Sequence, residues 1–506
     1  MEKVISDDVE MKRSQLRAVK QFMFEPTVDL TPSQTLEGGG TTSSPFLVQS
    51  IQDLLLVQNA VNSDGEILST GSAERVPART ACYKQTDDID LTACCAVNGS
   101  WTPIGTSSVS YDNKSHPFSG SYDGNNKSIT NLYINTTINN AGFFGSCSGA
   151  TINGLSVSGE VSGATDVGLL AGYIEKSGKR TKIINCKSYG SVSGSSNFVG
   201  GLIGASNKYT DISGCANYAE VSGVNCVGGI VGEIDGTDIF NCSNSGKVSG
   251  ASLTGGIVGS IKFTDYGFAV ANCFNTGEIT ASESSVGGIV GQVDTYSYCG
   301  GNKIANCINA GKVRNAIIEN SRLMPVSNCY WLETASANGV GKLSDQQSVI
   351  LPLTEAELKG DISTGASLYS DSKGNYYTTL LDALNAWAAD NSDDYYNIIY
   401  SGWEFTGSAK CPTFTYQAAE KPQSSTEVFF HSFAVTHTCS TFALPFVAGS
   451  YTKATINWGD GNDENYGTAA SHDYSADGEH TVTVSAENAQ SFKLSNIKGV
   501  SELHLK

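Results

Sequence analysis

One phrase recurs four times in the middle of the chain, and it limits the possible folds more than any other feature. It reads Val-Gly-Gly-Ile-Val-Gly with small changes, and its copies begin at Val199, Val227, Thr254 and Val286. A second phrase, Asn-Cys-x-Asn or a near copy, keeps step with it at 214–217, 241–244, 272–275 and 306–309. A steady period of this length is typical of solenoids, in which stacked units bury a shared core.

The residues within one repeat indicate which solenoid this is. Each repeat has three short β-branched runs separated by Gly, Asn and Ser, and no helical period, which predicts three strands and three turns per coil. We therefore expect an all-β chain built on a right-handed parallel β-helix with small capping helices. Repeated Ile and Val should fill its interior, and stacked Asn amides should bond from coil to coil. Degenerate copies at Ala141 and Val167 indicate that the stack begins before the clean repeats.

The two phrases together resemble the GLUG repeat of bacterial cell-surface and secreted proteins, several of which are adhesins. The resemblance covers about half of the chain, and the clean repeats span residues 199–313. It implies a solenoid at the cell surface. It does not choose between catalysis and binding, because GLUG repeats accompany both peptidase domains and binding domains.

Composition narrows the possible partners. The chain has 506 residues and a formal charge of −19, so nucleic acid and anionic membrane surfaces are not expected partners. Only 16% of the residues are charged and 55 are glycine, which fits an extracellular all-β protein of two or three domains. We expect a monomer.

Six of the 14 cysteines recur once per repeat, at Cys186, Cys215, Cys242, Cys273, Cys307 and Cys329. A column of this kind predicts small, buried, reduced thiols, with bridges between adjacent coils as the alternative. Neither the cysteines nor the six histidines form a metal-ligand pattern, so no metal or cofactor is expected.

Three regions follow from the pattern along the chain. Residues 1–44 have the composition of a flexible leader, and 45–420 form the β-helix. A helix over 51–61, opened by Ser50, should cover the first coil, and helices beginning after Thr354 and over 377–389 should close the other end.

The third region, 421–506, resembles a polycystic-kidney-disease-type (PKD-like) module, an immunoglobulin-like β-sandwich. The resemblance rests on Trp-Gly-Asp-Gly at 458–461, His-Asp-Tyr at 472–474 and the alternating run 480–484. The tail 492–505 has the spacing of a leucine-rich segment.

No apolar run is long enough to span a membrane, and Met1 to Leu30 lacks the apolar stretch of a signal peptide. An extracellular or surface location therefore requires a signal or lipid anchor outside the given sequence.

The sequence contains no recognisable set of catalytic residues, because the repeats present Val, Ile, Gly and Ser and acidic residues occur singly at turns. Insertions of varying length follow Gly259 and Gly291, and insertions of this kind often mark the binding face of a solenoid. Four aromatic residues on them are the candidate binding residues: Tyr266, Phe268, Tyr296 and Tyr298. Packing of these rings over the solenoid is an equally supported interpretation.

The sequence thus predicts a non-catalytic surface or secreted adhesin whose flank binds host glycoprotein, matrix or polysaccharide. A polysaccharide lyase or glycoside hydrolase on the same scaffold is the alternative from another class. A structural spacer in a surface assembly is the third.

Overall fold

A computed structural model describes most of the chain. The described residues are 29–107, 115–262, 269–283, 285–294, 303–320, 325–342, 347–359, 364, 367–371, 373–392, 399–405, 411–418, 430–437, 441–443, 447–448, 453–461, 463–465, 471–474, 479–487, 491–492 and 500–505. The chain divides into two compact units, residues 1–422 and 423–506.

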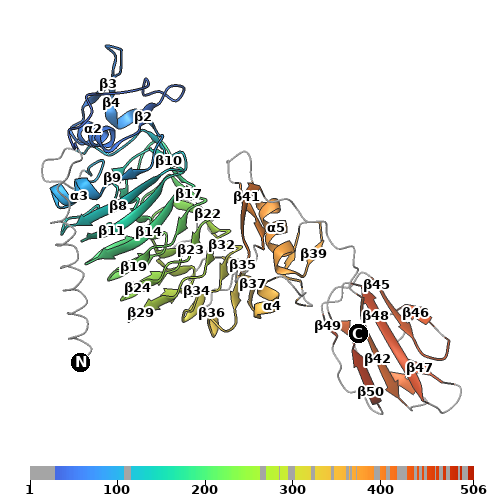
Figure 1. The fold of residues 1–506 in the computed structure, drawn as a ribbon. Coiled ribbons are helices and arrows are strands. Elements are labelled where there is room, and N and C mark those ends of the chain that lie inside the picture. Colours follow the sequence, from blue (N-terminus) through green and yellow to red (C-terminus); the bar gives the residue numbers. More distant parts are fainter. Residues whose placement is uncertain are drawn as a thin grey trace. The chain divides into compact units, whose positions relative to one another are not determined.

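The first unit is built on a β-solenoid, whose coil strands pair in parallel with their equivalents in neighbouring coils (Figure 1). One wall is an eight-stranded sheet of β9 (Phe144–Cys147), β12 (Ala171–Ile174), β16 (Ile203–Ser206), β21 (Val231–Ile234), β26 (Val258–Lys262), β31 (Val290–Asp294), β34 (Asn315–Asn320) and β36 (Asn338–Lys342). A short four-stranded sheet adjoins it, with β15 (Asn197–Gly200), β20 (Asn225–Gly228), β25 (Ser252–Gly255) and β30 (Val286–Gly287).

The remaining strands form a 22-stranded sheet that contains three columns. The first column holds β2 (Phe46–Val48), β5 (Cys82–Gln85), β7 (Ser121–Asp123), β10 (Thr151–Asn153), β13 (Thr181–Ile184), β17 (Thr210–Ser213), β22 (Thr237–Phe240), β27 (Ala269–Ala271), β32 (Lys303–Ala305), β35 (Val326–Leu332) and β37 (Gln347–Leu353). The second holds β6 (Ile89–Asp90), β8 (Ser128–Asn135), β11 (Ser156–Gly163), β14 (Lys187–Gly194), β18 (Ala216–Asn217), β23 (Ser243–Asn244), β28 (Phe274–Asn275) and β33 (Ile308–Asn309). The third holds β19 (Glu220–Ser222), β24 (Val248–Gly250) and β29 (Ile279–Ala281), which continue the outer half of β14.

A clean coil contains five short strands, β15 to β19 for example, so the expectation of three was wrong. The strands are interrupted at residues that the sequence pattern places inside longer β-branched runs. At Gly201, a Cβ atom would lie 2.3 Å from Oδ1 of Asn217, so the chain bends there against the asparagine and only glycine fits. The registers nevertheless follow the repeated phrase, and Ala141 and Val167 are bridged as the degenerate copies predict.

The interior is filled by columns of equivalent apolar side chains. The phrase residues Ile230, Ile257 and Ile289 are fully buried, as are their neighbours Val231 and Val258. The cysteine column is also buried, and its six members are free thiols. Burial raises the pKa of these thiols well above the usual range, at Cys186, Cys215, Cys307 and Cys329. The expectation that this column is buried in the core is confirmed.

A ladder of buried amides runs along the interior. Nδ2 of Asn217 donates to Oδ1 of Asn244, Asn244 to Asn275, and Asn275 to Asn309, each at 2.8 Å. Each Nδ2 also donates to the carbonyl two residues further on, at 2.8–3.0 Å. The ladder therefore pairs the buried amide donors and ties each coil to the next.

The N-terminal helix α2 (Ile51–Asn62) begins where the sequence predicts, with Ser50 Oγ accepting the N–H of Asp53. It lies over the first coil, because Gln58 and Asn62 donate to the carbonyls of Thr102 and Pro103. The preceding glycine-rich run, which the composition assigns to a flexible leader, is folded. Its strand β1 (Thr35–Leu36) pairs with β3 (Glu66–Ser69), next to β4 (Arg75–Pro77), and α3 (Thr92–Asn98) follows.

The C-terminal helices of this unit cover the flank of the solenoid, whereas the sequence predicted that they close its end. Residues 354–418, called the flank module, comprise α4 (Glu355–Leu358), β38 (Tyr369–Ser370), β39 (Tyr376–Tyr377), α5 (Leu380–Asn391), β40 (Ser401–Glu404) and β41 (Thr413–Ala418). The capping box of Thr354 and Glu357 is present as predicted. The module packs on outward apolar side chains: Phe240 lies 6.0 Å from Tyr400, and Phe274 lies 5.9 Å from Trp403 between ring centroids.

A second set of asparagines anchors this module. Asn241 exchanges hydrogen bonds with the carbonyl of Ile399 and the N–H of Ser401. Trp403 Nε1 donates to Oδ1 of Asn272 at 2.6 Å, and Nδ2 of Asn306 donates to the Leu384 carbonyl. The first Asn of the repeated phrase thus holds the flank module, while the second Asn builds the internal ladder.

The second unit has a five-stranded antiparallel sheet in the order β46 (Asp463–Asn465), β45 (Lys453–Asn457), β48 (His480–Glu487), β42 (Phe430–His437) and β50 (Val500–Leu505). Two antiparallel pairs accompany it, β43 (Thr441–Ala443) with β47 (Ser471–Asp473) and β44 (Val447–Ala448) with β49 (Ser491–Phe492). Trp458 is fully buried, and its carbonyl accepts the hydroxyl of Tyr474.

Candidate functional site

Two exposed tyrosines stack on the outer face of the large sheet. Tyr189 on β14 and Tyr218 after β18 have ring centroids 4.9 Å apart and planes within 5° of each other. Their exposed fractions are 38% and 46%, and partial burial together with the charge of Tyr218 raises the pKa of Tyr189. We call this pair the tyrosine ledge. Each ring covers one face of the other at the coil spacing, so the pair leaves its outer faces and edges open to solvent.

Polar side chains border the ledge on both sides. Lys187 precedes Tyr189 by two residues on the same strand, and Glu220 follows Tyr218 by two, so all four side chains lie on the outer face. A hollow of about 180 Å³ lies beside the ledge, on β8, β11 and β14. Its lining is rich in hydroxyl groups and contains Tyr133, Asn135, Glu160, Ser162, Ser191 and Ser193. Apolar rings next to hydroxyls and single charges can hold a sugar or a polar peptide.

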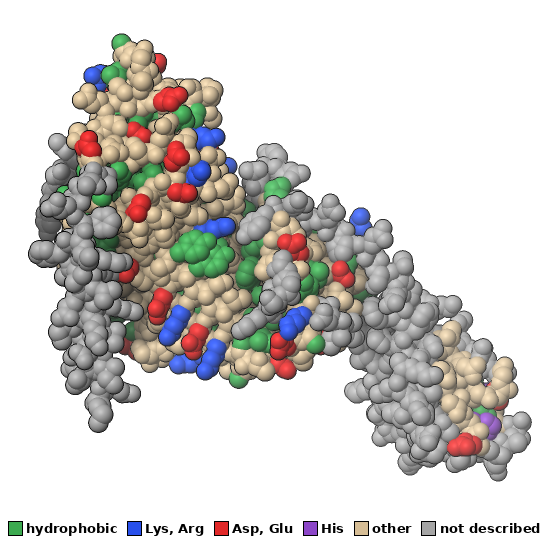
Figure 2. Space-filling view, viewed as in Figure 1, with side chains coloured by type: hydrophobic (Ala, Val, Ile, Leu, Met, Phe, Trp, Pro, Cys, Tyr) green, Lys and Arg blue, Asp and Glu red, His purple; other side chains and the backbone are tan. Residues whose placement is uncertain are grey.

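Charged side chains alternate in sign further along this face. Glu220, Lys247, Glu278 and Lys312 occupy equivalent positions in four successive coils, and all are exposed. Figure 2 shows hydrophobic side chains gathered over the middle strands of the solenoid, with acidic and basic side chains alternating below them. Since neighbouring charges of opposite sign offset each other, this row carries little net field.

A second cluster, called the charged edge, lies on the first column of the large sheet. Asp211 and Asp238 are register partners in adjacent coils, and both accept from Nη1 of Arg180, Asp238 at 3.2 Å. Burial raises the pKa of both carboxyl groups, although Arg180 opposes this shift. Nζ of Lys303 lies 5.1 Å from the ring of Trp387 in the flank module, and burial lowers the pKa of this lysine.

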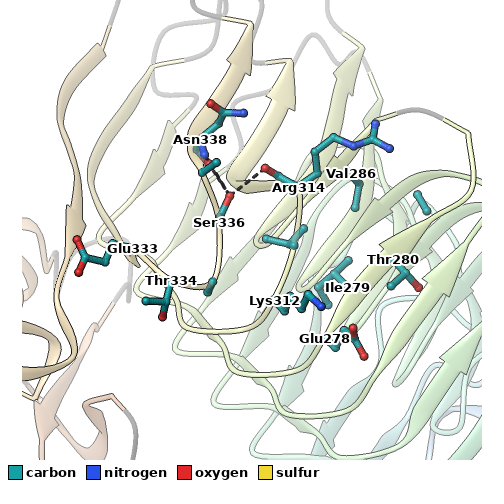
Figure 3. Close-up of a pocket in the computed structure, with 14 residues that line it drawn as sticks. Glu278, Ile279, Thr280, Val286, Lys312, Arg314, Glu333, Thr334, Ser336 and Asn338 are labelled. Atoms are coloured by element: carbon teal, nitrogen blue, oxygen red, sulfur yellow. Dashed lines mark hydrogen bonds between the residues drawn. The ribbon is translucent and has the colours of Figure 1, made fainter.

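A pocket of about 710 Å³ opens at one corner of the last coils (Figure 3). Its floor is apolar and contains the buried side chains Ile279, Val286, Val313 and Ala335. Its rim carries Glu278, Lys312, Arg314 and Glu333. Ser336 lies on the opposite wall and contacts the carbonyls of Arg314 and Asn338 at 2.9 and 2.8 Å. We call it the corner pocket.

The four aromatic residues predicted from sequence, Tyr266, Phe268, Tyr296 and Tyr298, lie outside the described residues. The segments that carry them end at Ala269 and Lys303, which belong to the large sheet. The N–H of Ala269 donates to Asp238 at 2.9 Å, so the first segment rejoins the described chain beside the charged edge.

Sequence reasoning missed the tyrosine ledge, although the repeat contained the signal for it. Tyr218, Ser245, Thr276 and Ala310 each directly follow the second Asn of the phrase. Tyr189 occupies the same position, because it follows Ser188, which pairs with Asn217 in the next coil. Aligning the copies shows two aromatic rings next to each other in a column that is otherwise small. Equivalent residues in adjacent coils stack, so this alone predicts the pair.

No helix in the described part of the chain has both the length and the apolar character needed to cross a membrane. The described side chains also form no group of three metal-ligating residues.

Comparison with known proteins gives one family match and one structural likeness. Residues 223–249 match the model of the GLUG motif. A search of curated proteins finds no match. A solved structure of a proposed immunoglobulin A1 protease from Bacteroides ovatus is similar, with 19% identity and a TM-score of 0.47, over 76% of this chain and 96% of that one. A likeness of this size carries no argument about activity.

Proposed function

We propose that this chain is a non-catalytic surface or secreted bacterial protein that binds host glycoprotein, matrix or polysaccharide on the solenoid flank. The observation that carries the proposal is the tyrosine ledge, because two large rings stay exposed on a face otherwise lined by small and charged residues. The GLUG motif supports the location, since the repeat resembles those of surface and secreted proteins.

A sugar ring is the ligand that this surface fits best. An outer ring face of the stack can receive the C–H face of a sugar, while Lys187, Glu220 and the hydroxyls of the neighbouring hollow are placed to meet the polar edge of the sugar. Aromatic contacts of this kind contribute about 0.5–1.5 kcal/mol each. Losing both rings should therefore weaken binding roughly tenfold or more.

The experiment is a glycan and matrix-protein array probed with the full chain and with the Tyr189→Ala/Tyr218→Ala double variant. Tyr376→Ala is the matched control, because Tyr376 is 40% exposed and lies in the flank module. We expect the double variant to lose binding and the control to keep it. Equal binding by all three proteins would refute the role of the ledge.

A carbohydrate-active enzyme is the second candidate, and the charged edge favours it. Hydrolysis of a glycosidic bond uses two carboxyl groups about 5–9 Å apart. Asp211 and Asp238 are close enough to share one guanidinium nitrogen, and a raised pKa suits a proton donor. Their bond to Arg180 argues the other way, because it fills the space between them.

Mass spectrometry of each array ligand after incubation separates the two candidates. Intact ligand supports the binding protein. Cleaved ligand, with cleavage lost in Asp238→Asn, would replace it by the enzyme.

Two finer features of the fold are part of the same proposal. Right-handed winding is supported by the strong preference of parallel strand crossovers for that hand. The antiparallel strands of 423–506 support a PKD-like sandwich beyond a β-helix of residues 45–420. The insertions with Tyr266, Phe268, Tyr296 and Tyr298 would extend the ligand-binding flank.

A further inference from the structure

The corner pocket lies where one coil lacks a turn that the preceding coils possess. In three successive coils, five or six residues separate the buried Val or Ile of the third column from the Val or Thr that precedes the first glycine of the repeated phrase. These pairs are Val221 and Val227, Val248 and Thr254, and Ile279 and Val286. In the next coil, Val313 is followed directly by Arg314.

Hydrogen bonds fix this equivalence. Val248 N–H donates to the Glu278 carbonyl, and Ile279 N–H donates to the Lys312 carbonyl, so Val313 is the counterpart of Ile279. Val290 pairs with Ile318, which makes Arg314 the counterpart of Val286. The five or six residues of the corner are therefore absent from this coil, and the four-stranded sheet ends at β30.

The missing turn leaves backbone donors on the edge that it would cover. Thr254 N–H donates to the Ser285 carbonyl of the next coil at 2.9 Å, and Gly223 N–H donates to Ser249 at 3.0 Å. Within the described residues, no carbonyl meets the equivalent N–H groups of Val286 and Ala281. The carbonyl of Arg314, which would serve Ala281, lies beside Ser336 Oγ.

We propose that the corner pocket binds an extended peptide segment of a partner protein, which completes the missing corner by strand addition. Carbonyl groups of the peptide accept from Ala281 and Val286, and one small apolar side chain sits on the floor formed by Val286 and Val313. Main-chain bonds supply the affinity of such contacts, and side-chain pockets supply the selection.

The lining favours a peptide over a sugar. The described lining of the pocket contains no aromatic ring, in contrast to the tyrosine ledge. The N–H groups of Ala281 and Val286, which no described carbonyl meets, face an edge that strands normally occupy. The rim charges are balanced, two acidic and two basic, so the segment needs no net charge. This site is separate from the one that carries the proposed function, and either can fail alone.

The chain itself provides the probe. Residues 248–254 form an intact corner, so a fluorescein-labelled peptide with the sequence Val-Ser-Gly-Ala-Ser-Leu-Thr and blocked ends should enter the pocket. The full chain is titrated with this peptide and with a scrambled version, and hydrogen exchange is followed over 279–287. We expect saturable binding of the native order and slower exchange at Ala281 and Val286.

Two variants test the place of binding. Inserting Ser-Gly-Ala-Ser-Leu between Val313 and Arg314 builds the missing corner, and Ala335→Trp fills the pocket from its floor if the insertion does not fold. Each should weaken peptide binding at least tenfold, whereas Tyr376→Ala should not. Equal binding to these variants overturns the proposal. Two other results would also overturn it. One is unchanged hydrogen exchange at Ala281 and Val286 with both this peptide and a pooled library of random seven-residue peptides. The other is displacement of the peptide by an oligosaccharide.

Discussion

Replacing Asn275 with alanine removes the centre of the internal amide ladder. Its Nδ2 donates to Oδ1 of Asn309 and to the Gly277 carbonyl, and its Oδ1 accepts from Asn244 and from the Gly277 N–H at 3.2 Å. All of these groups lie in the buried interior. Alanine leaves Asn309 Oδ1 and both backbone groups of Gly277 without these partners.

Each buried polar group that loses its partner costs about 1–3 kcal/mol, so three such groups predict a loss of about 3–9 kcal/mol in the free energy of unfolding. A water molecule entering the vacated space would keep the loss near the lower figure. The control is Asn225→Ala, because Asn225 is half-buried and accepts one bond, from Ser252 Oγ. It should cost about 1 kcal/mol or less.

Urea unfolding followed by circular dichroism gives the two losses. Hydrogen exchange over the coils around Asn275 shows whether they open first, as nearest-neighbour coupling in a solenoid predicts. If Asn275→Ala is no more destabilising than Asn225→Ala, the ladder does not hold the coils together. Asn275→Asp adds a second check. It places a buried carboxyl among acceptors, so its pKa should rise, and the variant should regain stability as the pH falls.

Two further predictions follow from buried titratable groups. Cys215 and Cys307 should resist iodoacetamide in the native chain while the partly exposed Cys82 reacts, because burial raises the pKa of these two thiols and so suppresses their thiolate forms. Rapid native labelling of Cys215 or Cys307, read by mass spectrometry, would contradict this. In the second unit, burial and the nearby His480 lower the pKa of His437, so the unfolded chain binds its proton more readily and stability should fall as the pH drops below about 6.5. Hydrogen exchange of β42 and β48 at pH 7.5 and 5.5 measures this, and His437→Gln should reduce the difference.

The repeated phrase predicts the solenoid because its physical causes are local. Alternating apolar residues, glycines at close approaches and an asparagine in each coil act between neighbours that are one period apart. Registers, the cysteine column and the amide ladder could all be read in this way. The number of strands could not, because the bend at Gly201 depends on the position of the Asn217 amide across the interior.

The position of the flank module could not be predicted from the repeated phrase. Helix α5 has an apolar face at helical spacing, and the sequence alone cannot say which surface covers it. The answer lies in outward residues that differ between copies. Phe240 takes the place of Ser213 in the preceding coil, and Phe274 and Ile308 occupy the position that Ala216 and Ser243 hold in earlier coils. Apolar substitutions on the outer face mark the docking surface, and polar ones mark the open flank.

The same comparison between copies separates the two candidate sites. Where the outer face turns apolar over several coils, this chain covers it with its own module. Tyr189 and Tyr218 are the contrasting case, because they interrupt a small column on coils that the described part of the module does not reach. The corner pocket arises from a deletion, which leaves an edge whose N–H donors meet no carbonyl of the described residues. In a repeat protein, then, departures from the repeat locate function, because the repeat itself accounts for the fold.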